Sequence, residues 1–136
     1  MAYVDSNVFI YPVIYDSRTE EKAKKARYIL EQIVSGELKA YTSTLTWDEV
    51  VWVVSRVLSR DDGVNQGRKL LGFPNLEFID VDQRTLSTAQ ALMDKYRLKP
   101  RDSIHLASAV NRGLRTMITD DEDFDVVKEI ERRPLA

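Results

Sequence analysis

The sequence predicts an α/β fold, namely a three-layer α/β/α sandwich with a mostly parallel sheet. Short apolar segments alternate along the chain with longer segments whose apolar residues recur at helical spacing. Parallel strands need a crossover connection, and a helix is the usual one. The length of 136 residues suits about one ordinary domain, so we expect a single domain over residues 1–136.

Short apolar segments between polar or turn residues predict the strands. The four segments are "AYV" (2–4), "KAYTS" (39–43), "LEFIDV" (76–81) and "TMIT" (116–119). In open parallel sheets the ligand crevice lies outside the carboxyl ends of the strands. We therefore expect residues that directly follow these strands to face one crevice.

Helical spacing and capping residues predict the helices. After an apolar segment interrupted by Pro12, which favours one or two helical turns, "SRTE" (17–20) has the form of a capping box with Ser17 as the cap of a helix that ends at Gly36. The other predicted helices are 46–58, a polar helix between the "DDG" break (61–63) and Leu71, one capped by Asp82, one from Pro100 to Gly113, and a last one near 126–130.

The composition excludes several kinds of chemistry. The chain has no cysteine and one histidine, His105, so disulfides, thiolate zinc sites and thiol nucleophiles are ruled out. A net charge of -2 gives no overall attraction to nucleic acid, so a polyanionic substrate requires a local basic patch or a bound cation. No segment reaches the roughly 20 apolar residues of a membrane span, and we expect a cytoplasmic protein that does not bind membranes.

Acidic residues lie at element ends that open on the predicted crevice. Asp5 follows the first strand, and the loop "DDEDFD" follows the last one. Asp102 and Glu49 lie in first helical turns, where Asp48 could equally be the acid that matters. Each acid alone is more simply a cap, a partner of the helix dipole or a solvated loop residue. Their joint placement indicates a site.

Several carboxylates that converge must be relieved by protonation or by a hard cation. Ligation by oxygen alone favours Mg²⁺ or Mn²⁺, which usually link protein carboxylates to substrate phosphates. Such ions polarise a phosphoryl oxygen and lower the pKa of a bound water. The acids therefore favour hydrolysis of phosphodiesters.

Four segments together resemble the PIN domain, particularly the VapC-like toxins of prokaryotic type II toxin-antitoxin pairs. They are "YVDSNVFIY", "TLTWDEVVWV", "KPRDSIHLASAV" and "MITDDEDFD". The resemblance implies a Rossmann-like fold and an endoribonuclease dependent on Mg²⁺ or Mn²⁺. It also implies an RNA substrate, a homodimer and neutralisation by a small antitoxin. The ligands that it implies are Asp5, Glu49, Asp102 and a fourth acid after the last strand.

The family pattern places the fourth acid at Asp121, with Asp120 as the alternative because "GLRTMIT" is one residue longer than usual. Asp123 belongs to the same loop. Ser6 and Thr119 match small hydroxyl positions that orient a ligand or phosphate, although each could simply cap or turn the chain.

Other residues receive a structural interpretation. A lone histidine in a helix is more often a packing residue than a catalyst, so His105 is predicted to pack. Trp47 and Trp52 are predicted to lie in the core or in an interface. Two rival functions remain, an aspartyl-phosphate phosphatase or receiver-like domain and a non-catalytic PIN-fold binding module. Against the first, position 7 is Asn and no lysine follows the last strand.

Overall fold

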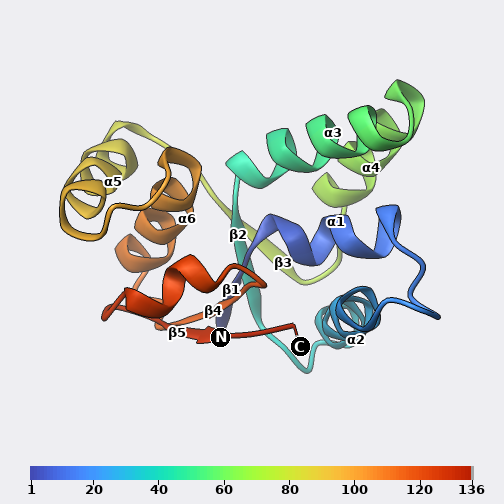
Figure 1. Ribbon diagram of the computed structural model, residues 1–136, viewed down its shortest axis with the longest axis horizontal. Helices are drawn as coiled ribbons and strands as arrows, with labels where there is room; N and C mark the ends of the chain where they lie inside the picture. The colour runs from blue at the N-terminus through green and yellow to red at the C-terminus, as the bar shows by residue number, and fades with distance from the viewer. Residues whose placement is uncertain (136) are drawn as a thin grey trace.

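The predicted α/β/α sandwich is confirmed in the computed structural model, which describes residues 1–135 (Figure 1). Over these residues the elements are, in order, β1 (Ala2–Val4), α1 (Ser6–Ile14), α2 (Glu21–Ser35), β2 (Ala40–Ser43), α3 (Leu45–Val57), α4 (Arg60–Leu71), β3 (Leu76–Ile79), α5 (Gln83–Tyr96), α6 (Pro100–Asn111), β4 (Thr116–Ile118), the 3-10 helix η1 (Glu122–Val126) and β5 (Glu131–Arg133). In the described part of the chain no helix combines the length and the apolar character that a bilayer crossing requires.

The sheet is parallel throughout, with the strand order β3-β2-β1-β4-β5. The first strand is therefore the central one, and its register pairs Tyr3 with Tyr41 on one side and with Met117 on the other. Asp5 follows this strand, and its backbone N–H donates to Ile118 O over 3.0 Å. The carboxyl ends of β1 and β4 thus bring Asp5 and the acidic loop to one edge, as the sequence predicts.

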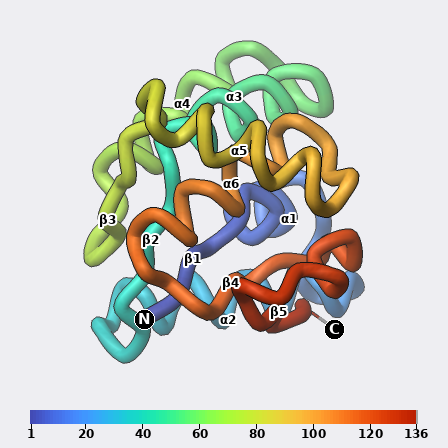
Figure 2. The backbone as a smooth tube through the Cα atoms, turned by 90° about the vertical axis from the view of Figure 1, so that its left-hand side faces the viewer, coloured from blue at the N-terminus to red at the C-terminus, as the bar shows by residue number. Residues whose placement is uncertain are grey.

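Alternation along the strands produces two cores, one on each face of the sheet. Ala2 and Val4 face the core formed with α1, α2, α3 and α4, whereas Tyr3 faces the core formed with α5 and α6. In Figure 1 the pair α5 and α6 lies to the left of the strands, and α1 and α2 lie to the right; Figure 2 shows α5 and α6 from the front. Each fully buried aliphatic side chain in these cores contributes about 1.5–3 kcal/mol.

The predicted C-terminal helix near 126–130 is wrong. A 3-10 helix occupies Glu122–Val126, and the chain then returns to the sheet as a fifth strand, β5, which the sequence analysis did not predict. The Tyr96 hydroxyl accepts a hydrogen bond from the Lys128 backbone N–H over 3.2 Å, so this N–H has a side-chain partner instead of a helical carbonyl. Because β5 is a polar edge strand, the apolar pattern that marks the other strands is missing.

The predicted capping box at Ser17 is also wrong. The second helix begins at Glu21, after Glu20, and no side chain caps it. Asp16 organises this turn instead, because its carboxylate accepts from the Arg18 backbone N–H over 2.9 Å and pairs with the Arg18 guanidinium. The other caps agree better, since Asp82 caps α5 and Pro100 begins α6.

The "DDG" segment is not a break but the first turn of α4, which Ser59 caps by accepting from the Asp62 N–H over 3.1 Å. Its glycine lies against α3, where a Cβ atom on Gly63 would come within 2.8 Å of Val51 O. Gly67, one turn later, leaves room for the indole of Trp47. Glycine therefore serves close packing of α3 against α4 at these two positions.

Candidate active site

Asp5 is the most buried acid at the carboxyl edge of the sheet, with 4% exposure. It follows β1 and caps α1, because its Oδ1 accepts from the Ser6 backbone N–H over 2.7 Å. The Ser6 hydroxyl lies 3.4 Å from the same oxygen. The cap of this helix is thus Asp5 rather than Ser6, and the buried carboxylate is fixed by donors.

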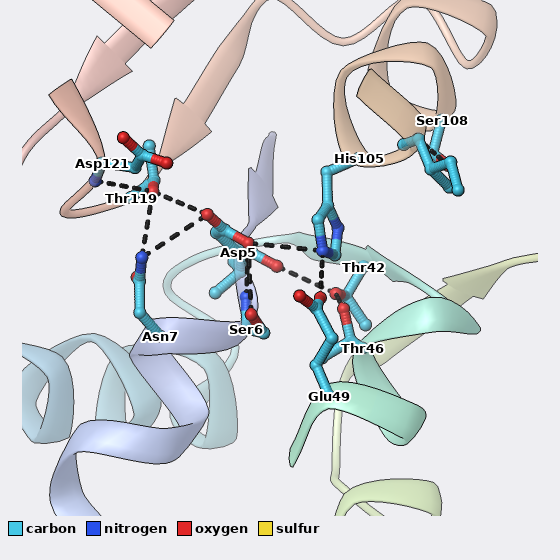
Figure 3. A network of polar contacts seen from close by, with 12 residues as sticks. Asp5, Ser6, Asn7, Thr42, Thr46, Glu49, His105, Ser108, Thr119 and Asp121 are labelled. Atoms are coloured by element: carbon cyan, nitrogen blue, oxygen red, sulfur yellow. Dashed lines mark hydrogen bonds and ion pairs between the residues drawn. The ribbon is translucent and has the colours of Figure 1, made fainter. Parts of the chain in front are cut away.

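The Thr119 hydroxyl connects Asp5 to the acidic loop (Figure 3). It donates to Asp5 Oδ2 over 2.7 Å and accepts from the Asn7 side-chain amide and from the Asp121 backbone N–H, both over 3.1 Å. Asn7 also contacts Asp120, because its Oδ1 accepts from the Asp120 N–H over 3.4 Å. One buried hydroxyl therefore sets the position of the loop relative to the first acid.

Glu49 approaches Asp5 from α3, and His105 lies between them. The His105 Nε2 is hydrogen-bonded to Glu49 Oε1 and lies 3.6 Å from Asp5 Oδ1. One ligand atom of each residue lies within 4.8 Å of the other two. Burial acts to lower the pKa of His105, but the nearby Tyr3 hydroxyl and both carboxylates outweigh it and hold that pKa well above 6.5.

Asp102, Asp121 and Asp123 form a second acidic group, again with ligand atoms within 4.8 Å of one another. Asp102 comes from the first turn of α6, as predicted. Burial, followed by the negative charges of Asp121 and Asp5, raises the pKa of Asp102 to about 7. A hydrogen bond between the Asp102 and Asp121 side chains adds to this, so Asp102 is partly protonated near neutral pH.

Both acidic groups open on one cleft. Its volume is about 590 Å³, and three predicted acids line it, Glu49, Asp102 and Asp121. Lys99 and Arg101 lie on the same cleft, which places positive charge beside the acids. Of the other predicted acids, Asp123 is exposed and donates its backbone N–H to Asp121 over 2.9 Å.

Asp120, the alternative fourth acid, has other partners. Its carboxylate accepts from the Tyr11 hydroxyl over 2.7 Å and lies 3.0 Å from Lys22 Nζ. Asp48, the alternative to Glu49, is exposed on α3 and does not line the cleft. The geometry therefore favours Glu49 and Asp121 over their neighbours.

The donor set suits a hard divalent cation. Apart from His105, every potential ligand in the two groups is a carboxylate, and Mg²⁺ and Mn²⁺ prefer oxygen. Burial, and then repulsion from Asp121 and Asp5, raises the pKa of Asp102, and a cation in this cleft would relieve that repulsion. Asp5, Glu49, Asp102 and Asp121 are the residues that would hold it.

Sequence reasoning missed the contacts of His105. The residue is 1% exposed and hydrogen-bonded, as a packing histidine would be, but its partner is the predicted acid Glu49. Its position one helical turn after Asp102 was the only available signal. The expectation for the tryptophans fails as regards the core, because Trp47 and Trp52 are 42% and 52% exposed.

The family model for the PIN domain matches residues 2–130. The chain belongs to the PIN domain family. This membership confirms the resemblance drawn from the sequence and agrees with acids gathered at the carboxyl edge of the sheet. No curated protein matches the sequence.

Solved structures share the fold of this PIN domain at low sequence identity. The VapC20 toxin of Mycobacterium tuberculosis, described as cleaving the Sarcin-Ricin loop, has a TM-score of 0.76 at 15% identity, with 98% of this chain and 100% of that chain covered. A toxin-antitoxin complex from Klebsiella pneumoniae gives 0.67 at 23% identity, with 96% of each chain covered. VapBC2 of Rickettsia felis, bound to a DNA fragment from its promoter, gives 0.71 at 16% identity, with 98% of each covered.

Proposed function

We propose that this PIN domain is an endoribonuclease that depends on Mg²⁺ or Mn²⁺ and acts as the toxin of a toxin-antitoxin pair. The observation that supports it most strongly is the gathering of Glu49, Asp102 and Asp121 on one cleft, with the buried Asp5 grouped with Glu49 and with a pKa of about 7 for Asp102. Carboxylates crowded in this way hold divalent cations in enzymes that cleave phosphodiesters.

The proposed cation site has two halves, each formed by a pair of acids. Asp5 and Glu49 form one half of the cation site, and Asp102 and Asp121 form the other, with Asp123 and Ser6 beside them. A bound Mg²⁺ or Mn²⁺ supplies a water of lowered pKa and stabilises charge on the phosphate.

The remaining side chains orient the acids and the substrate. Thr119 and Asn7 keep Asp5 aligned through their hydrogen bonds. The net charge of -2 does not attract nucleic acid to the chain as a whole. Lys99 and Arg101 line the cleft, where their positive charges attract the phosphates of a single-stranded or structured RNA.

The proposed partners follow from the relatives. Because solved relatives include toxin-antitoxin complexes, we infer a small antitoxin protein that neutralises the activity of this chain in the cytoplasm. We also infer a homodimer, which the exposed Trp52, Val57 and Leu58 of the α3–α4 hairpin support as apolar surface. Co-expression with the product of an adjacent small reading frame should suppress cleavage, and light scattering should give the mass of two chains.

The experiment that tests the nuclease is Asp5→Asn. This change removes one ligand charge with little change in volume, so cleavage of single-stranded RNA in Mn²⁺ should be lost while the circular dichroism spectrum stays as in the wild type. The surface variant Lys24→Gln is the matched control and should cleave normally. Wild-type cleavage by Asp5→Asn would show that the assigned acids do not carry the reaction.

A further inference from the structure

His105, the only histidine of the chain, bridges the buried Tyr3 and the acids of the site. The Tyr3 hydroxyl lies 2.5 Å from Nδ1, and the two rings pack edge to face with centres 5.7 Å apart. On the other side of the imidazole, Nε2 is hydrogen-bonded to Glu49 and lies 3.6 Å from Asp5. Tyr3 and His105 are 0% and 1% exposed, so water does not replace these partners.

The partners fix where the imidazole carries its proton. An ionised carboxylate only accepts hydrogen bonds, so the bond from Nε2 to Glu49 requires a proton on Nε2. On the other side of the ring, the Tyr3 hydroxyl is the hydrogen-bond partner of Nδ1. A protonated Nε2 has no lone pair for a cation, although the residue lies close enough to the acids to be one of the ligands.

The same bonds fix the carboxylates. The imidazole engages Oε1 of Glu49, so Oε2 is the oxygen that this hydrogen bond leaves free for a cation. The Ser6 N–H and the Thr119 hydroxyl hold Asp5 in a comparable way. The orientation of Glu49 alone depends on a residue whose own ring is held by a buried tyrosine.

We propose that Tyr3 and His105 are positioning residues that hold Glu49 and Asp5 in the geometry of the cation site, and that His105 is a donor to these acids rather than a ligand. The proposal rests on the proposed function, because it assigns a role toward the cation of that site. Outer partners of metal ligands commonly change metal affinity by about 10–100-fold.

Nitrogen NMR tests the donor assignment without ambiguity, because a single histidine gives the imidazole signals. Protein labelled with ¹⁵N at histidine should show a protonated Nε2 in the metal-free state and still show it after Mg²⁺ is added. In Tyr3→Phe the Nδ1 signal should move, since its hydrogen-bond partner is lost. A wild-type Nε2 that lacks a proton, or loses it when Mg²⁺ binds, would overturn the proposal.

Binding of Mn²⁺, measured by electron paramagnetic resonance, tests the positioning. Tyr3→Phe should weaken binding at least about threefold and His105→Leu by about 10–100-fold, whereas His105→Gln should recover much of the affinity because its amide can still donate to Glu49. Tyr41→Phe is the matched control, since Tyr41 pairs with Tyr3 in the sheet, is 4% exposed, and its hydroxyl donates to Met1 Sδ over 3.5 Å rather than to a residue of the site. It should bind Mn²⁺ like the wild type.

Two failures can be told apart. A wild-type protein that bound no Mn²⁺ would overturn the proposed function and this proposal together. A wild type that binds Mn²⁺ with the same affinity as Tyr3→Phe would overturn this proposal alone. Tyr3→Phe removes one oxygen and keeps the ring, so the comparison stands even where His105→Leu does not fold.

Discussion

Lys22 lies 3.0 Å from Asp120 and compensates the charge of the acid next to Asp121. The Tyr11 hydroxyl also donates to this carboxylate over 2.7 Å, so Asp120 contacts side chains of α1 and α2 rather than the cleft. Asp120→Asn should therefore keep the Mn²⁺ affinity within about threefold of the wild type, because Lys22 and solvent already screen that charge.

Asp121→Asn is the matched change one residue later, and it should reduce RNA cleavage by at least about 100-fold, since several kcal/mol of transition-state stabilisation depend on a correctly held cation. Titration calorimetry with Mn²⁺ and a gel assay on the two variants make the comparison. The opposite ranking would make Asp120 the fourth acid.

The proton held by Asp102 predicts how the affinity for Mn²⁺ depends on pH. Since burial and neighbouring acids raise the pKa of Asp102 to about 7, binding must displace a proton at lower pH. The affinity should fall by about tenfold between about pH 8 and about pH 6, with about one proton released per ion at the lower pH. Calorimetry in buffers of different ionisation enthalpy counts that proton, and Asp102→Asn should abolish the release. A flat profile would contradict the assignment.

The same pKa predicts a stability effect in the metal-free protein. The folded state binds the Asp102 proton more tightly than the unfolded state does. The stabilisation of the fold by this proton is therefore complete below about pH 4 and is lost as the pH rises to about 7. At pH 8 the free energy of unfolding of Asp102→Asn should therefore exceed that of the wild type by on the order of 1 kcal/mol after screening by solvent. Denaturant unfolding measures this difference. Lower stability of the variant at pH 8 would show that the ionised Asp102 carboxylate does not destabilise the folded state.

Thr119 offers a test of the hydroxyl that connects Asp5 with the acidic loop. Thr119→Val keeps the shape but leaves the Asp121 N–H and the Asn7 amide without their acceptor, which costs about 1–3 kcal/mol. Mn²⁺ affinity should also fall by about 10–100-fold, because Asp5 loses an orienting donor. Thr119→Ser retains the hydroxyl and should recover most of both quantities in thermal unfolding and binding measurements.

Close packing in the α3–α4 hairpin can be tested with glycine variants. An added Cβ at Gly63 would meet Val51 O at 2.8 Å, and a backbone atom cannot move aside cheaply. Gly63→Ala should therefore destabilise the protein by about 1–3 kcal/mol in spite of its better helix propensity. At Gly72 the nearest atom to such a Cβ is Arg68 O at 3.8 Å, so Gly72→Ala should be neutral or slightly stabilising in urea unfolding.

Much of this architecture follows from local sequence patterns. The four apolar strands, the cap at Asp82, the helix start at Pro100, and the placement of Asp5 after a strand and of Asp102 in a first turn are short-range signals. The parallel topology brings both acids to one edge. The four acids predicted from the sequence accordingly lie in two adjacent groups around one cleft.

The features that sequence reasoning missed depend on contacts between distant residues. The fifth strand is polar and pairs with the outer edge of β4, where Thr116 lies opposite Glu131. Nothing local distinguishes a packing histidine from one that bridges Tyr3 and Glu49, because those partners lie 102 and 56 residues away along the chain. The capping box at Ser17 fails for a local reason instead, because the Asp16 carboxylate accepts from the Arg18 backbone N–H and organises this turn.

The strand β5 also holds the backbone of Thr119 through two hydrogen bonds. Arg133 O accepts from the Thr119 backbone N–H over 3.1 Å, and the Arg132 guanidinium donates to Thr119 O over 3.3 Å. A nascent chain that has left the ribosome only as far as residue 130 lacks both contacts, so the residue that aligns Asp5 is not yet anchored. During translation, the proposed cation site is thus anchored only once Glu131–Arg133 has emerged, after its four acids have been synthesised.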